Sequence, residues 1–412
     1  MIDEATLEAH LTDHLPAQRW FGSSAVESLE SVRELDGKLI QVIVRGDDGA
    51  RYQAVLGVRD DGSIVDATTD HDLSLALFQQ VMPDEQVSKV RPLGAEQTNT
   101  SLVFDERLVL KVFRRLANGP NPDIDVTKTL ADIGFEHVIA PVGLWRDGDD
   151  YAVVNELLPS STDGWHLAIP SLRDMYDRRC PPDEAPGDFG FEAERLGAVT
   201  AELHVAMADA FGLHAADVDR WVADLEAQLA RVDLPSAIAK RVRAAYLALR
   251  DVDPGPGIRI HGDYHLGQTL RSDDGWFVLD FEGEPARPVD ERGTTSSALR
   301  DVAGMVRSFG YAAAVSLRDL GGADDEELRA LASAWERHVA ERFLAGYEGY
   351  AEVDRVLPPR EARQAVQRAF ELDKAVYEVG YELGHRPDWV DIPLAAVHRL
   401  LGPSGQEWEG RS

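Results

Sequence analysis

Two short polar segments carry residues whose types and spacing suit phosphoryl transfer. HGDYHLGQ, residues 261–268, places Asp263 in a glycine turn and an amide, Gln268, five residues later. The apolar run WFVLDF then ends near Asp280, seventeen residues after Asp263. Two carboxylates and an amide form an all-oxygen set of the kind that Mg²⁺ prefers. Phosphoryl transfer needs one carboxylate to orient the attacking hydroxyl and oxygen ligands for the metal on the phosphates.

These needs assign a role to each residue. We expect Asp263 to orient and deprotonate an acceptor hydroxyl, and Gln268 and Asp280 to hold Mg²⁺. The catalytic segment of protein kinases has the same order of a base, an amide and a later carboxylate. A His-Gly-Asp tripeptide alone is more typical of a simple turn. The complete ordered set favours the kinase interpretation.

An upstream segment supplies what a nucleotide would need. GAEQTNTSLVF predicts a polar turn, and LVLKVFRRL predicts a strand that carries Lys111. A buried ammonium group is costly without a partner, so we expect a phosphate or a helix carboxylate beside it, with Asp125 as the candidate. The alternative is that Lys111 faces outward from its strand, which the alternation of a strand allows.

Further nucleotide contacts are predicted on either side of this strand. The turn residues Asn99, Thr100 and Ser101 offer hydroxyl and backbone N–H groups to phosphates. VVNELLP, residues 153–159, is the expected connector, and the backbone groups of Glu156 and Leu158 are available to an adenine.

The elements that position these residues fall into three parts. Residues 1–88 predict a small α+β cap, with a helix over 3–16, alternating strands over 28–67 and a helix over 70–81. Residues 89–158 predict a strand-rich lobe with one helix, in which Pro122 suits the first turn and Gly134 the end. Residues 159–412 are mostly helical, with periodicity over 189–210, 216–231, 235–252, 295–319, 324–349 and 359–384. The fold class expected is α+β.

Composition excludes several classes of protein. The chain has 412 residues and a formal net charge of −31, without a Lys/Arg-rich run, which argues against a nucleic-acid partner. The one cysteine, Cys180, rules out a disulfide framework. No secretory signal and no apolar run of about 18–20 residues is visible, so no membrane partner and a cytoplasmic location are expected.

Several longer motifs together identify a resemblance to a known family. The chain resembles the actinobacterial maltokinases, within the aminoglycoside-phosphotransferase-like and protein-kinase-like group, over nearly its full length. The motifs are QRWFG at 18–22, NTSLVF at 99–104, LKVFRRL at 110–116, GPNPDIDV at 119–126, DGWHLA at 163–168, HGDYHLGQTLR at 261–271, DFEGEPARP at 280–288, LRDVAGMVRSF at 299–309 and ELDKAVYEVGYELGHRPDW at 371–389. The resemblance implies a bilobal kinase-like fold with an N-terminal cap, and ATP and Mg²⁺ as cofactors.

The resemblance also directs attention to a sugar site. Asp373, Tyr377 and Tyr381 recur at helical spacing on one face, with Glu382 and Trp389 close behind. Similarity to the family favours a sugar pocket here over a packed amphipathic helix. Glu282 is expected to brace that site, together with Arg300 and Asp301. His265 is expected either to hold its loop or to contact the sugar.

The resemblance implies maltose as the leading acceptor, with maltose 1-phosphate as the product. A glucosamine kinase that makes the 6-phosphate is the alternative, because an acidic pocket with Asp373, Glu382 and Asp388 would suit an amino sugar. A catalytically silent binding protein and an antibiotic phosphotransferase are further alternatives. The sequence leaves open whether the chain is a monomer or a homodimer.

Overall fold

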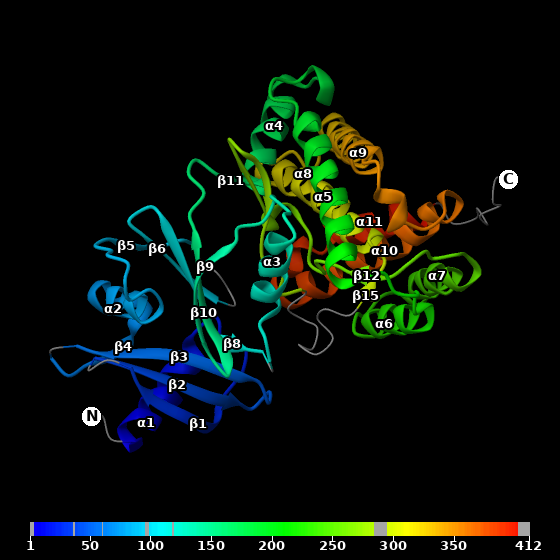
Figure 1. The fold of residues 1–412 in the computed structure, drawn as a ribbon. Helices are drawn as coiled ribbons and strands as arrows, with labels where there is room; N and C mark the ends of the chain where they lie inside the picture. Colours follow the sequence, from blue (N-terminus) through cyan, green and yellow to red (C-terminus); the bar gives the residue numbers. More distant parts are fainter. Residues whose placement is uncertain are drawn as a thin grey trace. The chain divides into compact units, whose positions relative to one another are not determined.

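The computed structural model describes residues 4–35, 38–59, 61–94, 99–117, 119–283 and 295–402. The chain divides into two compact units. One unit holds residues 1–131 and 139–160, and the other holds residues 132–138 and 161–412. Figure 1 shows that the first unit is rich in strands and the second is mostly helical, as the predicted α+β class requires.

The first unit contains two antiparallel sheets. One has the order β1-β2-β3-β4, with β8 paired to β3, and α1 packs its buried leucines against it. The other has the order β5-β6-β7-β10-β9. The elements are α1 (Glu4–His14), β1 (Val26–Glu34), β2 (Leu39–Gly46), β3 (Arg51–Val58), β4 (Ile64–Asp66), α2 (His71–Val81), β5 (Val90–Pro92), β6 (Asn99–Phe104), β7 (Leu108–Phe113), β8 (Arg115–Leu116), α3 (Pro122–Asp132), β9 (Pro141–Asp147) and β10 (Asp149–Glu156).

Both sheets of the first unit share one hydrophobic core. The helix α2 contributes Leu77 and Phe78, and these side chains cluster with strand residues from both sheets, among them Val55 and Phe104. Residues before and after the predicted boundary between cap and lobe, near residue 88, therefore pack in the same hydrophobic cluster. The helix α3 begins at Pro122, and Gly134 follows its end with φ +87°, as the sequence predicted.

Buried charge also joins the two sheets. Arg114 is 1% exposed and forms an ion pair of 2.8 Å with Asp66. It donates hydrogen bonds to the hydroxyls of Thr68 and Thr100, both at 2.9 Å. The ring of Trp20 lies against the guanidinium, 4.6 Å from its central carbon. Trp20 belongs to the QRWFG motif, so this motif anchors α1 and its sheet to β6.

The second unit is a helical bundle with two small sheets. The pairs α5 with α9 and α8 with α10 make extensive contacts, and β11, β13 and β14 form the larger sheet. The elements are β11 (Thr162–Asp163), α4 (Gly164–Arg178), α5 (Gly190–Phe211), α6 (Val218–Ala230), α7 (Ser236–Leu247), β12 (Ile258–Arg259), β13 (Thr269–Ser272), β14 (Gly275–Val278), β15 (Thr295–Ser296), α8 (Leu299–Asp319), α9 (Glu326–Gly349), α10 (Arg360–His385) and α11 (Asp391–Leu401).

The long helices of this unit match the predicted periodicity closely. The helices α4 and α11 have no counterpart among the predicted ranges. Pro170 inside α4 and Pro393 inside α11 interrupt the usual sequence pattern of a helix. Among the described residues, none of the helices has the length and apolar character that a membrane span needs.

Candidate active site

A buried carboxylate on α8 anchors the predicted catalytic loop, residues 261–268. Asp301 accepts the backbone N–H groups of His261 at 2.8 Å and of Gly262 at 2.9 Å. His204 of α5 lies 3.2 Å from the same carboxylate, and its other ring nitrogen lies 2.7 Å from the Tyr347 hydroxyl. Burial would raise the pKa of Asp301, but the hydrogen bond from His204, together with the neighbouring imidazoles and the Gly262 N–H, lowers it. The loop is thus fixed by its backbone, which leaves its side chains available for chemistry.

His261 connects this loop to the end of β14. Its Nδ1 accepts the N–H of Asp263 at 3.3 Å, and its Nε2 donates to the carbonyl of Leu279 at 2.8 Å. The N–H of Leu279 in turn donates to the carbonyl of Gln268 at 2.9 Å. These bonds hold the loop and the residue before Asp280 in one fixed arrangement, as the two quoted motifs require.

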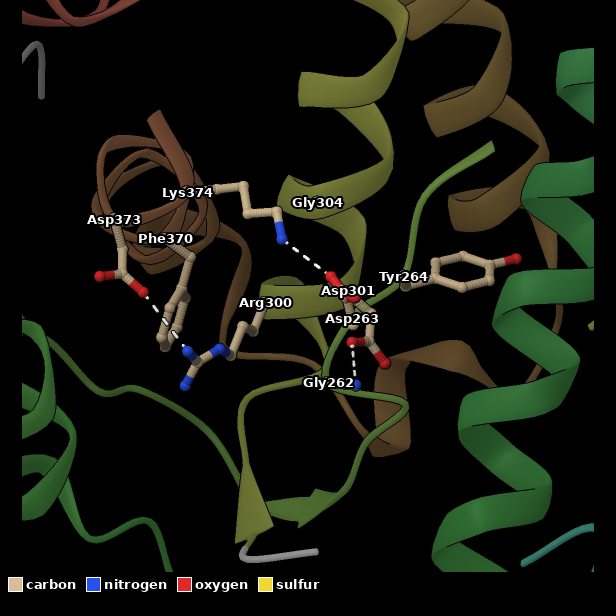
Figure 2. A pocket seen from close by; sticks show the side chains of 9 residues that line it. All are labelled: Gly262, Asp263, Tyr264, Arg300, Asp301, Gly304, Phe370, Asp373 and Lys374. Carbon is tan, nitrogen blue, oxygen red and sulfur yellow. Dashed lines mark hydrogen bonds and ion pairs between the residues drawn. The ribbon is translucent and has the colours of Figure 1, made fainter. Parts of the chain in front are cut away.

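The carboxylate of Asp263 lines a pocket and is paired there with a lysine. Lys374 of α10 donates from Nζ to Oδ1 of Asp263 at 2.9 Å, as Figure 2 shows. The pocket is lined by Gly262, Asp263, Tyr264, Arg300, Asp301, Gly304, Phe370, Asp373 and Lys374. Burial would raise the pKa of Asp263, but the charge of Lys374, helped by His265, lowers it to about 2. Asp263 is therefore ionised at neutral pH.

His265 holds the loop and also faces the carboxylate. Its Nδ1 accepts the N–H of Gly267 at 3.1 Å and so caps a short 3-10 turn over Leu266–Gln268. Its Nε2 lies 3.9 Å from Oδ2 of Asp263. Desolvation lowers the pKa of His265, although the charge of Asp263 opposes this shift. Because Nδ1 accepts the N–H of Gly267, the ring proton lies on Nε2, directed toward Asp263. Of the two roles predicted for His265, these contacts favour holding the loop.

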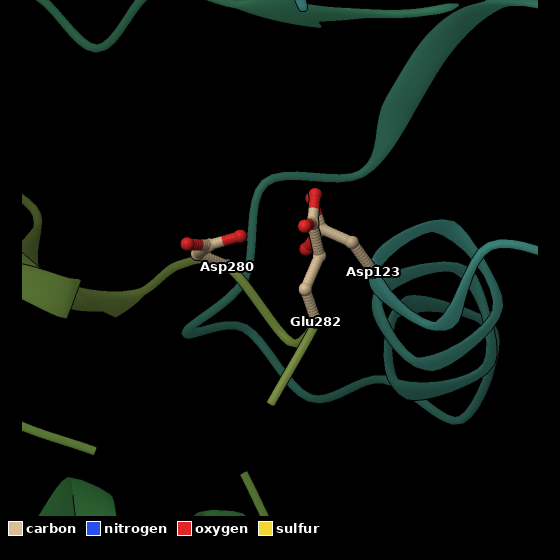
Figure 3. A group of neighbouring side chains, drawn as sticks. All are labelled: Asp123, Asp280 and Glu282. Carbon is tan, nitrogen blue, oxygen red and sulfur yellow. The ribbon is translucent and has the colours of Figure 1, made fainter. Parts of the chain in front are cut away.

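Three oxygen-bearing side chains gather at the end of β14. The amide of Gln268 donates to Oδ2 of Asp280 at 3.1 Å. Figure 3 shows the Asp280 and Glu282 side chains on the chain that follows β14, and their nearest carboxylate oxygens lie within 4.8 Å of each other. Asp280 has φ 63°, a left-handed conformation that side chains other than glycine seldom adopt. An amide with two carboxylates is a donor set that fits Mg²⁺, so Glu282, predicted for the acceptor, is also a candidate metal ligand.

In the first unit, the structure corrects the predicted partner of Lys111. The ammonium of Lys111 pairs with Asp123 at 2.9 Å, and the predicted partner was Asp125. Because α3 starts at Pro122, Asp123 lies in the first turn and is buried. Asp125 points about 200° further around the helix. On that side its negative charge helps to raise the pKa of Arg146. The expectation that Lys111 has a helix carboxylate beside it holds with this change of residue.

The structure also corrects the predicted turn at Asn99–Ser101. These three residues begin β6, where Ser101 stands opposite Lys111 on β7. Asn99 and Ser101 are buried, and the Thr100 hydroxyl accepts the hydrogen bond from Arg114. The β-branched and aromatic residues of NTSLVF, Thr100, Val103 and Phe104, favour a strand over a turn. The preceding residues 95–98 of the predicted turn lie outside the described residues.

The predicted connector forms the end of β10. Glu156 closes that strand opposite Leu108, and the N–H of Leu157 donates to the carbonyl of Arg107 at 2.8 Å. Glu156 is exposed and Leu158 is half-buried on either side of this bond. The hydrogen bond at Leu157 fixes the chain between these two residues. The backbone groups of Glu156 and Leu158 stay candidates for contacts with the adenine.

The residues predicted for the sugar occupy two separate parts of α10. Asp373 lies 3.4 Å from Arg300 in the pocket that contains Asp263, and the ring of Tyr377 lies 4.8 Å from the Lys374 ammonium. Glu382 lies about 13.5 Å further along the helix axis from Asp373, at 1.5 Å per residue. The predicted set from Asp373 to Glu382 is therefore too long to surround one small sugar.

The second group is a cluster at the C-terminal end of α10, around Arg386, which follows the helix. Glu382 is 1% exposed and binds both the Tyr311 hydroxyl and the Arg386 guanidinium. Tyr381 stacks on His385 at 4.3 Å between ring centroids, and Trp389 lies 4.7 Å from Arg386. The carboxylate of Glu382 is occupied by these partners, which explains its burial without a sugar.

Sequence reasoning missed Lys374 and His204. Lys374 stands beside Asp373 in the quoted motif, but a lysine on an amphipathic helix is usually exposed, and nothing local indicates that it points at Asp263. His204 lies 57 residues before the loop, and only the packing of α5 against the loop anchor brings it there. The neighbouring pair Arg300 and Asp301 was expected to brace the site, and Asp301 does so through the loop backbone.

These features define a class of protein: a kinase-like phosphotransferase, with an ionised aspartate on an anchored loop and a group of oxygen-bearing side chains that fits a metal ion. The chain belongs to the phosphotransferase enzyme family, whose model matches residues 89–354. Membership confirms the predicted kinase-like α+β fold and the predicted enzyme class, an ATP-dependent phosphotransferase. It agrees with the predicted cofactors, ATP and Mg²⁺.

Relatives of the chain are more specific. A glucosamine kinase of Mycolicibacterium smegmatis is 31% identical over 332 residues, which cover 76% of this chain and 79% of that protein. A glucosamine kinase of Streptacidiphilus jiangxiensis is 29% identical over 400 residues, covering 87% and 88%. A solved glucosamine kinase in complex with glucosamine, ADP and inorganic phosphate superposes with a TM-score of 0.68 at 25% identity, covering 97% of this chain and all of that one.

Proposed function

We propose that this protein is an ATP- and Mg²⁺-dependent glucosamine kinase that forms glucosamine 6-phosphate. Both curated relatives described above carry the name glucosamine kinase, and neither carries that of a maltokinase. The observation that carries the proposal is the pocket in which Asp263 and a second carboxylate, Asp373, lie together. A protonated sugar amine is best bound by a carboxylate, and maltose offers no such group. The glucosamine alternative of the sequence analysis therefore replaces maltose as the first choice.

The residues of the pocket have distinct roles in this reaction. The 6-hydroxyl oxygen attacks the γ-phosphorus of ATP, while its proton passes to the carboxylate of Asp263. The bond between the γ-phosphorus and the β,γ-bridging oxygen breaks, and ADP leaves with that oxygen. Gln268, Asp280 and Glu282 would hold Mg²⁺, which neutralises charge on the phosphates. Asp263 is ionised and anchored, so it mainly orients the hydroxyl and receives the proton late in the transfer.

Other predicted residues keep narrower roles in the proposal. Lys111, fixed by Asp123, serves the phosphates of the nucleotide, and Asn99 and Ser101 flank it on β6. Glu156 and Leu158 supply backbone groups to the adenine. Tyr381, Glu382 and Trp389 are no longer assigned to the sugar, because their cluster lies about 13.5 Å along α10 from Asp373. The cytoplasmic location stays a prediction from the sequence.

A comparison of acceptors tests the proposal. Formation of ADP is followed with glucosamine, N-acetylglucosamine, glucose, maltose and kanamycin at fixed ATP and Mg²⁺. We expect kcat/KM for glucosamine to exceed that for glucose and N-acetylglucosamine by at least about 100-fold, because a site built for a polar group rejects analogues that lack it. Equal or better turnover of maltose, glucose or kanamycin would show that the acceptor is wrong.

A substitution locates the discrimination within the pocket. The change Asp373→Asn should lower kcat/KM for glucosamine by about 100-fold and leave that for glucose nearly unchanged, since only the sugar amine needs the charge. Asp251→Asn is the matched control, because Asp251 is exposed in the same unit and has no predicted role in the site. If Asp373→Asn weakens both sugars equally, Asp373 supports the pocket and does not recognise the amine.

A further inference from the structure

The proposed base is paired with a lysine that comes from a different element. The loop HGDYHLGQ contains neither lysine nor arginine. The cation beside Asp263 is supplied by α10, more than 100 residues later, through Lys374 at 2.9 Å. The two side chains are 19% and 17% exposed, so water screens the pair only in part. Ordering a long lysine side chain here carries an entropy cost, which indicates that the ammonium has a specific task.

The geometry distinguishes the two oxygens of the Asp263 carboxylate. Oδ1 accepts the hydrogen bond from Lys374, whereas Oδ2 lies 3.9 Å from His265 Nε2, beyond hydrogen-bonding distance. His265 is itself fixed, because its Nδ1 accepts the N–H of Gly267. Of these two pairings only that of Oδ1 is a close contact, so Oδ2 is the better placed of the two oxygens to accept a hydrogen bond from an acceptor hydroxyl.

Lys374 is in turn held by its neighbour on α10. The ring of Tyr377, three residues later, lies 4.8 Å from the Lys374 ammonium. Residues three apart on a helix face the same side, and an aromatic face attracts an ammonium. Tyr377 thus orients Lys374, which gives this predicted sugar residue a role that needs no contact with sugar.

We propose that Lys374 is a positioning residue for phosphoryl transfer: it fixes the Asp263 carboxylate through Oδ1 and so directs Oδ2 toward the acceptor hydroxyl. The inference rests on the proposed function, because it takes Asp263 as the base. The titratable and charged groups around Asp263 are Lys374 on α10, His261 and His265 on the loop, and Arg300, Asp301 and Asp373 on the pocket wall. Of these, Lys374 makes the largest favourable contribution to the anionic form of Asp263.

Substitution of Lys374 by methionine tests this role, because methionine keeps the length and removes the charge. We expect kcat to fall by about 100-fold, the loss typical of one preorganised polar group, while KM for ATP changes by less than about threefold. Lys240→Met is the matched control, since Lys240 is exposed on α7. A kcat for Lys374→Met within about threefold of the control would overturn the proposal.

The pH profile separates positioning from simple packing. Without Lys374, burial acts on Asp263 with less opposition, so its pKa rises and the acid limb of the kcat/KM profile moves to higher pH. A role in packing alone would lower activity and leave this limb in place. The limb in Lys374→Met must therefore lie above that of Lys240→Met, and coincident limbs would count against the proposal.

Chemical rescue guards against a variant that folds poorly. Cys180 is the one cysteine, so a Cys180→Ser background with Lys374→Cys presents a single thiol. Alkylation with 2-bromoethylamine restores an ammonium on a side chain of nearly the original length. Recovery of at least about tenfold in kcat is expected, whereas alkylation with iodoacetamide should give none. Equal rates after both treatments would refute a need for the charge.

The failures of the two proposals are distinguishable. If the wild-type protein does not phosphorylate glucosamine, the proposed acceptor fails, and the same variants are compared with whichever sugar the wild type does phosphorylate. A titration of ¹³C-labelled aspartate carboxyls, with Asp263→Asn for assignment, needs no substrate. The Asp263 signal should titrate at higher pH in Lys374→Met than in Lys240→Met, and an unchanged midpoint would overturn the inference.

Discussion

Asp301→Asn tests whether a buried carboxylate holds the catalytic loop. Asp301 is 1% exposed and accepts three hydrogen bonds: Oδ2 accepts from His261 N–H and from His204, and Oδ1 accepts from Gly262 N–H. Asparagine has only one oxygen, so its NH₂ group must face at least one of these donors. The orphaned donor costs about 1–3 kcal/mol, and the lost charge weakens the remaining bonds by about 1 kcal/mol. The expected loss of stability is therefore about 2–4 kcal/mol.

The assay combines thermal unfolding with kinetics. For a unit of this size, such a loss should lower the unfolding midpoint by several degrees, at about 2–4 °C per kcal/mol. We also expect kcat to fall at least about tenfold, because the loop that carries Asp263 loses its anchor. Asp251→Asn, at an exposed position in the same unit, is the control. An Asp301→Asn protein with the midpoint and kcat of that control would refute the anchoring role.

Three further substitutions test the packing of α8 against the loop, the buried ion pair of the first unit and the metal ligands. Gly304→Ala should lower kcat at least about tenfold, because the new Cβ would lie 2.6 Å from the Tyr264 carbonyl oxygen and would force α8 away from the catalytic loop. Gly384→Ala, which has open space around the new Cβ, is the control and should leave kcat unchanged. Arg114→Met should destabilise the first unit by about 3–5 kcal/mol in urea unfolding, because Asp66 is left buried without its cation; a double change with Asp66→Asn that is fully additive would contradict this pairing. Asp280→Asn should weaken Mn²⁺ binding, measured by electron paramagnetic resonance, at least about tenfold, and unchanged binding would remove Asp280 from the metal site.

Much of the site could be predicted because its residues lie close together in the chain. Asp263, Gln268 and Asp280 share one turn and one short hairpin, so spacing alone indicates that they meet. The structure adds the bonds that enforce this arrangement, chiefly those of His261 to Leu279 and of Leu279 to Gln268. Local sequence signals of this kind depend on turns and strand ends, which short motifs encode well.

The parts that could not be predicted depend on tertiary packing. The choice between Asp123 and Asp125 for Lys111 depends on the residue at which α3 begins, and helix ends are the least certain part of a sequence prediction. Lys374 meets Asp263 only through the packing of α10 beside the loop. The helical spacing of Asp373, Tyr377 and Tyr381 was correct, but spacing gives no information on how far along the helix a pocket extends.

The most direct test of the central claim is product analysis with glucosamine, ATP and Mg²⁺ for the wild type and Asp263→Asn. Phosphorus NMR and ADP release are recorded together, so transfer to sugar is separated from hydrolysis to inorganic phosphate. We expect glucosamine 6-phosphate from the wild type, formed in equal amount to ADP, and a rate at least about 100-fold lower for Asp263→Asn with its fold intact. Undiminished sugar phosphate from Asp263→Asn, or ADP with only inorganic phosphate from the wild type, would contradict this expectation.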